Sequence, residues 1–149
     1  MKKNNKGFSL VELIIVIAIM AILAGALAPA LIKYINKSKR SSDISNADTI
    51  RSACQTAMSN PEVAEEFGSD DVTFKASDIT SAAGVTNCPK FTSEAKSILG
   101  STTLTLKYKD GWSGNDKDFH VTINMKDNTV TVADANSKQI TPNAEDPWK

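Results

Sequence analysis

The sequence is poor in the residues that build most metal and catalytic centres. Among its 149 residues there are one His and two Cys. A structural zinc site takes about four ligands, mostly of these two kinds, so the composition argues strongly against one. Seventeen Lys and Arg balance seventeen Asp and Glu, for a formal net charge of zero. This balance disfavours a nucleic-acid-binding protein, which usually carries a clustered basic excess.

Charge is also missing from one long stretch near the start of the chain. Residues 13–32 contain no charged side chain. Twenty residues of helix rise about 30 Å, the thickness of the hydrocarbon core of a bilayer. Three Lys precede this stretch within residues 1–7, and four basic residues follow it within residues 33–40. The neutral total is therefore a sum of segregated blocks, and residues 13–32 are predicted to span or anchor in a membrane.

Three interpretations fit a basic start followed by an apolar run. A secretory signal peptide has a shorter apolar core followed by a small-x-small cleavage site. The best such site, Ala26-Leu27-Ala28, would leave Pro29 at the new N-terminus. A plain membrane anchor fits the length but does not account for Glu12, because an ionisable group in a membrane segment is costly and usually functional. The third interpretation is a specialised membrane segment.

The string K-G-F-S-L-V-E-L at residues 6–13 favours this third interpretation. It resembles the prepilin signal of type IV pilins and the related pseudopilins, closely over about the first 30 residues. The resemblance implies cleavage after Gly7 by a membrane-embedded prepilin peptidase and methylation of the new amine on Phe8. It also implies that Glu12 neutralises the Phe8 amine of a neighbouring subunit and so sets the axial register of a filament.

The residue types at these positions suit those roles. Gly7 leaves the backbone open to a protease at the membrane surface. Glu12 lies four residues after Phe8, so its carboxylate is expected near the positive end of the helix and near the freed amine. A single chain permits this contact within itself. Pro29 crowds the carbonyl of Gly25, so a weak point or kink in the helix is expected between these two residues.

Beyond the apolar run, the sequence predicts a continuing helix with one apolar face. Apolar residues recur at three- and four-residue steps up to Met58, and Asn60-Pro61 ends the pattern. A helix over residues 8–59 would be about 78 Å long. The predicted organisation is a leader at 1–7, a membrane or filament-core half at 8–32, an amphipathic half at 33–59 and the rest of the head at 60–149.

The head region predicts short helices followed by strands. The segments 61–67 and 94–99 are predicted helices, the first capped by Asn60 and the second by Thr92 or Ser93. Period-two alternation then predicts three strands, with Asp127-Asn128 as a tight turn between the last two. The expected fold class is α+β, a long N-terminal helix packed on a small head with an approximately three-stranded antiparallel sheet. The apolar strand positions are Leu104, Leu106 and Tyr108, then Phe119, Val121, Ile123 and Met125, then Val130 and Val132.

Other candidate sites are weaker. Cys54 and Cys88 would form a disulfide if the head lies outside the cytoplasm, the alternative being two free thiols. A loop of Asp110, Asn115, Asp116 and Asp118 has oxygen ligands suited to calcium, but its spacing is not that of an EF-hand, and a solvated loop is the favoured interpretation. His120 is expected at the surface. Trp112 and Trp148 either contact neighbouring subunits or pack locally.

The predicted function is a structural subunit of a type IV pilus-like filament, without enzymatic activity or a cofactor. The resemblance implies these partners: copies of itself, the prepilin peptidase, an assembly ATPase, a platform protein and the membrane. It implies a cytoplasmic N-terminus and an extracytoplasmic head before assembly, and a cell-surface filament afterwards. One alternative is a pseudopilin of a type II secretion or competence DNA-uptake machine, and only the competence role would involve nucleic acid. A second alternative is a membrane-anchored extracellular binding domain.

Overall fold

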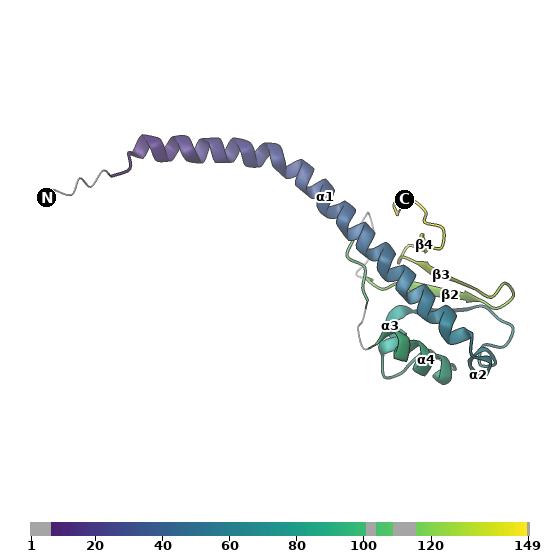
Figure 1. Cartoon of the computed structure of the whole chain (residues 1–149). Coiled ribbons are helices and arrows are strands. Elements are labelled where there is room, and N and C mark those ends of the chain that lie inside the picture. The colour runs from purple at the N-terminus through teal and green to yellow at the C-terminus, as the bar shows by residue number, and fades with distance from the viewer. Residues whose placement is uncertain (1–6, 101–103, 109–115, 149) are drawn as a thin grey trace. The chain divides into compact units, whose positions relative to one another are not determined.

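A computed structural model describes residues 7–100, 104–108 and 116–148 of the chain (Figure 1). By its internal contacts the chain divides into two compact units, Met1–Ser38 and Lys39–Lys149. Helix α1 (Leu10–Met58) supplies nearly all of the described part of the first unit and the first element of the second. The predicted long helix is confirmed, with ends two residues and one residue inside the predicted bounds.

The end of α1 follows the predicted signal. Asn60 adopts an extended conformation, and its side chain accepts a hydrogen bond from the backbone N–H of Glu62 at 3.1 Å. Pro61 follows as the first residue of α2 (Pro61–Ala64), where a missing N–H costs no helical hydrogen bond. Helix α2 is shorter than the predicted 61–67, although Phe67 is still buried. Asn60 therefore separates the two helices by capping the second.

The head contains an antiparallel sheet of four strands in the order β1-β2-β3-β4. The α+β class is confirmed, with four strands in place of about three. The central hairpin was expected, whereas the two outer strands were not. In the register, Phe74 lies opposite Val121 and Ile123 lies opposite Val130. The strands are β1 (Val72–Lys75), β2 (His120–Asn124), β3 (Thr129–Ala133) and β4 (Gln139–Thr141).

The turn between β2 and β3 contains the predicted Asp127-Asn128 pair but spans residues 125–128. Asn128 has φ of 50°, in the left-handed region that Asn tolerates better than most residues. The side-chain oxygen of Asn124 accepts hydrogen bonds from the backbone N–H groups of Lys126 and Asp127. This bonding closes β2 at Asn124, so Met125 belongs to the turn and not to the strand.

The strand predicted at Leu104, Leu106 and Tyr108 was wrong, because residues 104–108 are not part of the sheet. Their alternation is real, since Leu106 and Tyr108 are buried. However, the N–H groups of Lys107 and Tyr108 donate to the carboxylate of Asp43 on α1. A side chain thus takes the hydrogen bonds that a neighbouring strand would need.

The helical part of the head differs from the prediction in two places. Helix α3 (Ala76–Thr80) was not expected. Helix α4 (Pro89–Leu99) begins before the predicted Thr92 or Ser93 cap, with Pro89 in its first turn. The carboxylate of Glu66 accepts the N–H groups of Lys90 and Phe91 at 3.0 and 2.9 Å. This cap comes from a residue distant in sequence, and local pattern could not reveal it.

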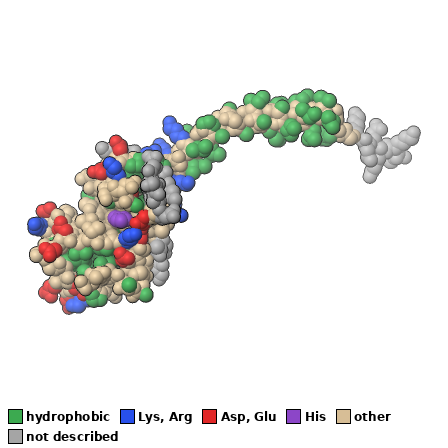
Figure 2. Space-filling model, turned by 180° about the vertical axis from the view of Figure 1, so that it is seen from behind, with side chains coloured by type: hydrophobic (Ala, Val, Ile, Leu, Met, Phe, Trp, Pro, Cys, Tyr) green, Lys and Arg blue, Asp and Glu red, His purple; other side chains and the backbone are tan. Residues whose placement is uncertain are grey.

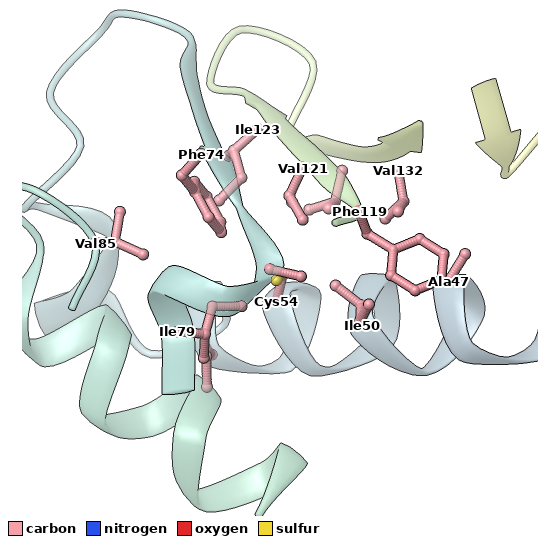
Figure 3. Packing of buried hydrophobic residues seen from close by; sticks show 14 of the residues in the cluster. Ala47, Ile50, Cys54, Phe74, Ile79, Val85, Phe119, Val121, Ile123 and Val132 are labelled. Carbon is pink, nitrogen blue, oxygen red and sulfur yellow. The ribbon is translucent and has the colours of Figure 1, made fainter. Parts of the chain in front are cut away.

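The core of the second unit lies between one face of the sheet and the last turns of α1. Figure 3 shows Ala47, Ile50 and Cys54 of α1 lying toward Phe119 and the side chains of β2 and β3. Phe91 of α4 is fully buried and makes edge-to-face contacts with Phe67 and Phe74, at centroid distances of 4.9 and 5.6 Å. Aromatic pairs favour this geometry because the ring edge is positive and the face negative.

Candidate functional site

The N-terminal motif lies at the start of α1. Gly7 to Ser9 precede the helix, and Glu12 lies in its first turn. The carboxylate Oε2 of Glu12 accepts a hydrogen bond from the backbone N–H of Ser9 at 2.9 Å. This is the Glu half of a capping box, in which the third helical residue reaches back to the N-cap. Sequence reasoning did not identify this cap, although the S-x-x-E spacing of Ser9 and Glu12 signals it.

The surroundings of Gly7 are open. A Cβ atom built at Gly7 would meet no heavy atom within 4 Å. Phe8, which follows it, has 87% of its surface exposed. The fold of the described residues therefore imposes no steric demand for glycine at position 7. If glycine is required there, the requirement comes from a molecule that binds this segment.

The apolar part of α1 is exposed along its whole length in the part of the chain that the structure describes. Every residue from 7 to 35 is exposed, including large side chains such as Ile22 at 72% and Leu27 at 65%. Among the described residues, α1 is the helix long and apolar enough to cross a membrane. Hydrophobic side chains cover its first part on the face seen in Figure 2. Burying such a surface would take lipid or other protein chains.

The predicted weak point does not interrupt the helix. Pro29 lies inside α1, and the helix continues through both Gly25 and Pro29. A Cβ atom at Gly25 would also meet nothing within 4 Å. Pro29 still lacks the N–H that a helical hydrogen bond requires. Local weakening at this point stays a prediction.

Comparison with known proteins places this segment in a family. The prokaryotic N-terminal methylation motif matches residues 2–28 of the chain. The N-terminal segment of this chain is therefore similar to that of type IV prepilins. It is 39% identical over 66 residues to a type IV major fimbrial protein FimA of Dichelobacter nodosus, covering 44% of this chain and 41% of the relative.

A fimbrial protein of the same organism is 45% identical over 51 residues, covering 34% of this chain and 32% of the relative. The chain thus spans less than half the length of these curated relatives. No solved structure matches it.

In the second unit, Asp43 joins α1 to residues 104–108. Asp43 has no exposed surface, and its two oxygens accept the N–H of Lys107 at 3.0 and 2.9 Å and that of Tyr108 at 2.7 Å. Burial raises the pKa of Asp43 above 3.8, whereas these hydrogen bonds and the nearby ammonium groups of Lys107 and Lys39 act to lower it. The side chain is an internal anchor and does not line an open site.

The C-terminal residues pack against the same region. Trp148 is 2% exposed, and its Nε1 donates to the carboxylate of Asp134 at 3.1 Å. Its ring meets Tyr108 edge to face at 5.7 Å, and Arg40 lies over Tyr108 at 5.2 Å. Arg40 also donates to the carbonyl oxygen of Pro147 at 2.7 Å. Of the two alternatives for Trp148, local packing is therefore the one observed, whereas Trp112 lies outside the described residues.

Both cysteines are buried as free thiols, so the expected Cys54–Cys88 disulfide is not formed in the structure. Burial raises the pKa of the Cys54 thiol to about 12. Burial and the neighbouring Glu66 carboxylate also raise the pKa of Cys88. Because the thiolate is the reactive form, both groups are poor nucleophiles in the folded head. The disulfide stays a prediction, and it would have to form before these side chains are buried.

Two of the four calcium candidates already have other partners. Asp116 accepts the ammonium of Lys75 at 2.7 Å and lies 3.3 Å from Nε2 of His120. The bond from Lys75 is the main cause that lowers the pKa of Asp116 to about 2. Asp118 accepts the N–H groups of Ser77 and Phe119.

The other two candidates, Asp110 and Asn115, lie outside the described residues. Within the described part of the chain, no group of three or more His, Cys, Asp or Glu residues could hold a metal ion. The hypothesis of a calcium site therefore gains no support from the residues that can be placed.

Two grooves in the second unit bear on the alternative of a binding domain. One of about 630 Å³ runs along α1 beside Ile98, and one of about 540 Å³ lies beside residues 81–87. Hydroxyl side chains dominate the first, and two of them, Thr49 and Thr56, donate to carbonyl oxygens of their own helix. Each groove contains a single charged side chain, Asp48 in the first and Lys96 in the second. Neither arrangement indicates a ligand.

Proposed function

We propose that this chain is the structural subunit of a type IV pilus-like filament. The observation that carries the proposal is the exposed apolar half of α1, which buries no residue within its own chain. Lipid can cover it before assembly, and the same half of other copies can cover it afterwards. The curated relatives matched by this segment are named fimbrial proteins, which supports a pilin.

Processing after Gly7 is the first step of the proposal. Gly7, Phe8 and Ser9 precede the helix and are exposed, and a Cβ atom at Gly7 would meet nothing within 4 Å, which suits a peptidase substrate. The match to the N-terminal methylation motif supports methylation of the new amine on Phe8. A prepilin peptidase at the membrane would perform both reactions. Cleavage would remove the three Lys of the leader and leave Glu12 four residues from the new N-terminus.

Glu12 would then exchange one partner for another. In the uncleaved chain its carboxylate caps its own helix through a single exposed hydrogen bond with Ser9. An exposed bond of this kind contributes little and is easily replaced. In a filament core without water, the amine of a neighbouring Phe8 would be the stronger partner. Removing one member of such a buried pair costs about 3–5 kcal/mol, because the other charge is left uncompensated.

The remaining partners follow from this scheme. The subunit would be held with its N-terminus in the cytoplasm and its head outside, then extracted by an assembly ATPase and a platform protein. Residues 13–32 are long enough to cross the hydrocarbon core. The assembled filament would lie at the cell surface. A pseudopilin shares all of these steps, and electron microscopy of sheared surface filaments distinguishes the two by showing whether long filaments form.

The decisive experiment replaces Glu12 by Val in the full chain. We expect the variant to be processed and inserted in the membrane but to form no filaments, since the buried amine loses its only acidic partner. Immunoblots of the membrane and sheared fractions measure both outcomes. Filaments in normal amounts from this variant would contradict the role of Glu12.

Gly7→Val serves as the matched control for processing. Because the structure is open around Gly7, we expect the variant to fold and insert normally while accumulating as an uncleaved precursor. The precursor retains seven additional residues and therefore migrates more slowly on a gel. Normal cleavage of Gly7→Val would remove the support for a prepilin cleavage site.

A further inference from the structure

The structure divides the basic segment after the apolar run into two pairs. Arg40 is part of the head, where it donates to Pro147 and lies over Tyr108. Lys39 lies near enough to Asp43 to lower its pKa. In contrast, Lys33 and Lys37 are fully exposed, and neither ammonium has an acidic partner within 4 Å among the described residues. The boundary between the two compact units, at Ser38, separates the two pairs.

Lys33 and Lys37 lie four residues apart in α1 and so project from one face of the helix. Like charges at this spacing repel, and the helix itself gains nothing from them. Under the proposed orientation they also lie on the outer side of the membrane, where Lys and Arg are normally depleted. A pair of exposed ammonium groups in this position is open to an anionic partner from outside the chain.

Helix geometry sets the depth of this pair. Measured along the helix from Ile32, Lys33 lies about 1.5 Å and Lys37 about 7.5 Å beyond the apolar run. The headgroup layer on each side of a bilayer is roughly 5–8 Å thick, so both Lys lie within it. Arg40, about 12 Å beyond the run, lies past this layer. Tyr34, which is 72% exposed, has the amphipathic ring that favours the same interface.

We infer that Lys33 and Lys37, flanking Tyr34, form a binding site for the phosphate groups of anionic lipids in the outer leaflet. The inference rests on the proposed membrane-held state of the subunit. Each ammonium can reach a phosphate because a long Lys side chain extends along the helix toward the headgroups. The site holds the subunit at a defined depth, with α1 emerging from the membrane at the residue where the second unit begins.

The test uses the full chain in vesicles of phosphatidylcholine that contain trace spin-labelled phosphatidylglycerol or spin-labelled phosphatidylcholine. Electron paramagnetic resonance measures the fraction of each lipid immobilised by the protein. We expect the anionic lipid to be preferred by roughly fivefold at low salt and the preference to vanish in high salt. The double variant Lys33→Gln/Lys37→Gln should lose most of the preference, the remainder coming from the three Lys of the leader.

Lys126→Gln/Lys138→Gln is the matched control, because it removes two exposed Lys from the head and changes the net charge equally. It should keep the preference. A wild-type chain without preference, or a Lys33→Gln/Lys37→Gln variant that retains the whole preference, overturns the inference. So does a Lys33→Gln/Lys37→Gln variant that forms fewer filaments with unchanged lipid preference, since the Lys pair would then bind acids of neighbouring subunits. A chain that does not enter vesicles at all contradicts the proposed membrane storage as well.

Discussion

The two halves of α1 differ in how they meet the rest of the chain and in how many apolar residues they carry. Residues 10–35 bury nothing, whereas the helix from Asp43 onward buries one face that includes Ile50 and Cys54. Apolar residues surround the first half on all sides but form a stripe on the second. A helix that is apolar all round needs lipid or other chains, while a striped helix suits a single partner surface. The number of apolar residues and their arrangement around the helix together distinguish intramolecular from intermolecular burial.

The largest expected effect comes from making the same substitution in both halves. Ile50 is 1% exposed and Ile22 is 72% exposed. We expect Ile50→Ala to destabilise the head by about 2–5 kcal/mol, because it removes buried apolar surface and leaves a cavity. In detergent this corresponds to a melting temperature lower by about 10 °C or more.

Ile22→Ala should leave the melting temperature of the head unchanged under the same conditions. Differential scanning calorimetry of both variants and the wild-type chain makes the measurement. Equal shifts for the two variants would show that the two halves do not differ as described.

A smaller effect is expected from Asp43→Ala, which tests whether a polar anchor belongs to the buried half. The substitution leaves the buried N–H of Tyr108 without an acceptor and releases residues 104–108 from α1. One buried N–H group without an acceptor lowers the free energy of unfolding by about 2 kcal/mol. Urea unfolding monitored by circular dichroism measures the loss. Asp70→Ala is the control, since Asp70 is exposed, and a midpoint shift as large as that of Asp43→Ala would argue against the anchor.

The smallest effect concerns the surface of the head. The pKa of Asp116 is lowered to about 2, chiefly by the bond from Lys75. The stability it contributes is therefore present above the ordinary value of 3.8 and is lost as pH falls through about 2. Asp116→Asn should lower the urea midpoint slightly at pH 6, and this difference should shrink as the pH falls through about 2. Asp127→Asn, at an exposed turn, is the control, and an Asp116→Asn difference as large at pH 2 as at pH 6 would refute the ion pair.

Sequence patterns predicted the elements whose signals are local. The helix end near Asn60 and the central hairpin follow from capping and alternation within a few residues. Strands β1 and β4 were missed because each has only four or three residues, too few for a periodic pattern. Residues 104–108 alternate correctly but are not a strand, since Asp43 accepts the N–H groups of Lys107 and Tyr108. Alternation shows which side chains are buried, but it does not show which groups accept the backbone hydrogen bonds.

The candidate site also has features that a local sequence pattern predicts and features that it does not predict. The motif around Gly7, Phe8 and Glu12 could be recognised because it is contiguous, and the structure adds the bond from Ser9 that Glu12 accepts. The partners of Arg40 and Trp148 are far apart in the chain, so no local pattern could pair them.

The sequence alone was enough to predict the apolar run of membrane length, the prepilin motif and the long helix, because each depends on consecutive residues or on a helical period. Only the tertiary structure decided which basic residues the head uses, that Trp148 packs within its own chain, and that a buried carboxylate holds residues 104–108. These depend on groups brought together by folding, in a core where most buried polar groups are hydrogen-bonded. Lys33 and Lys37 stand out as an exposed pair because the same folding gives Arg40 a partner and leaves them without one.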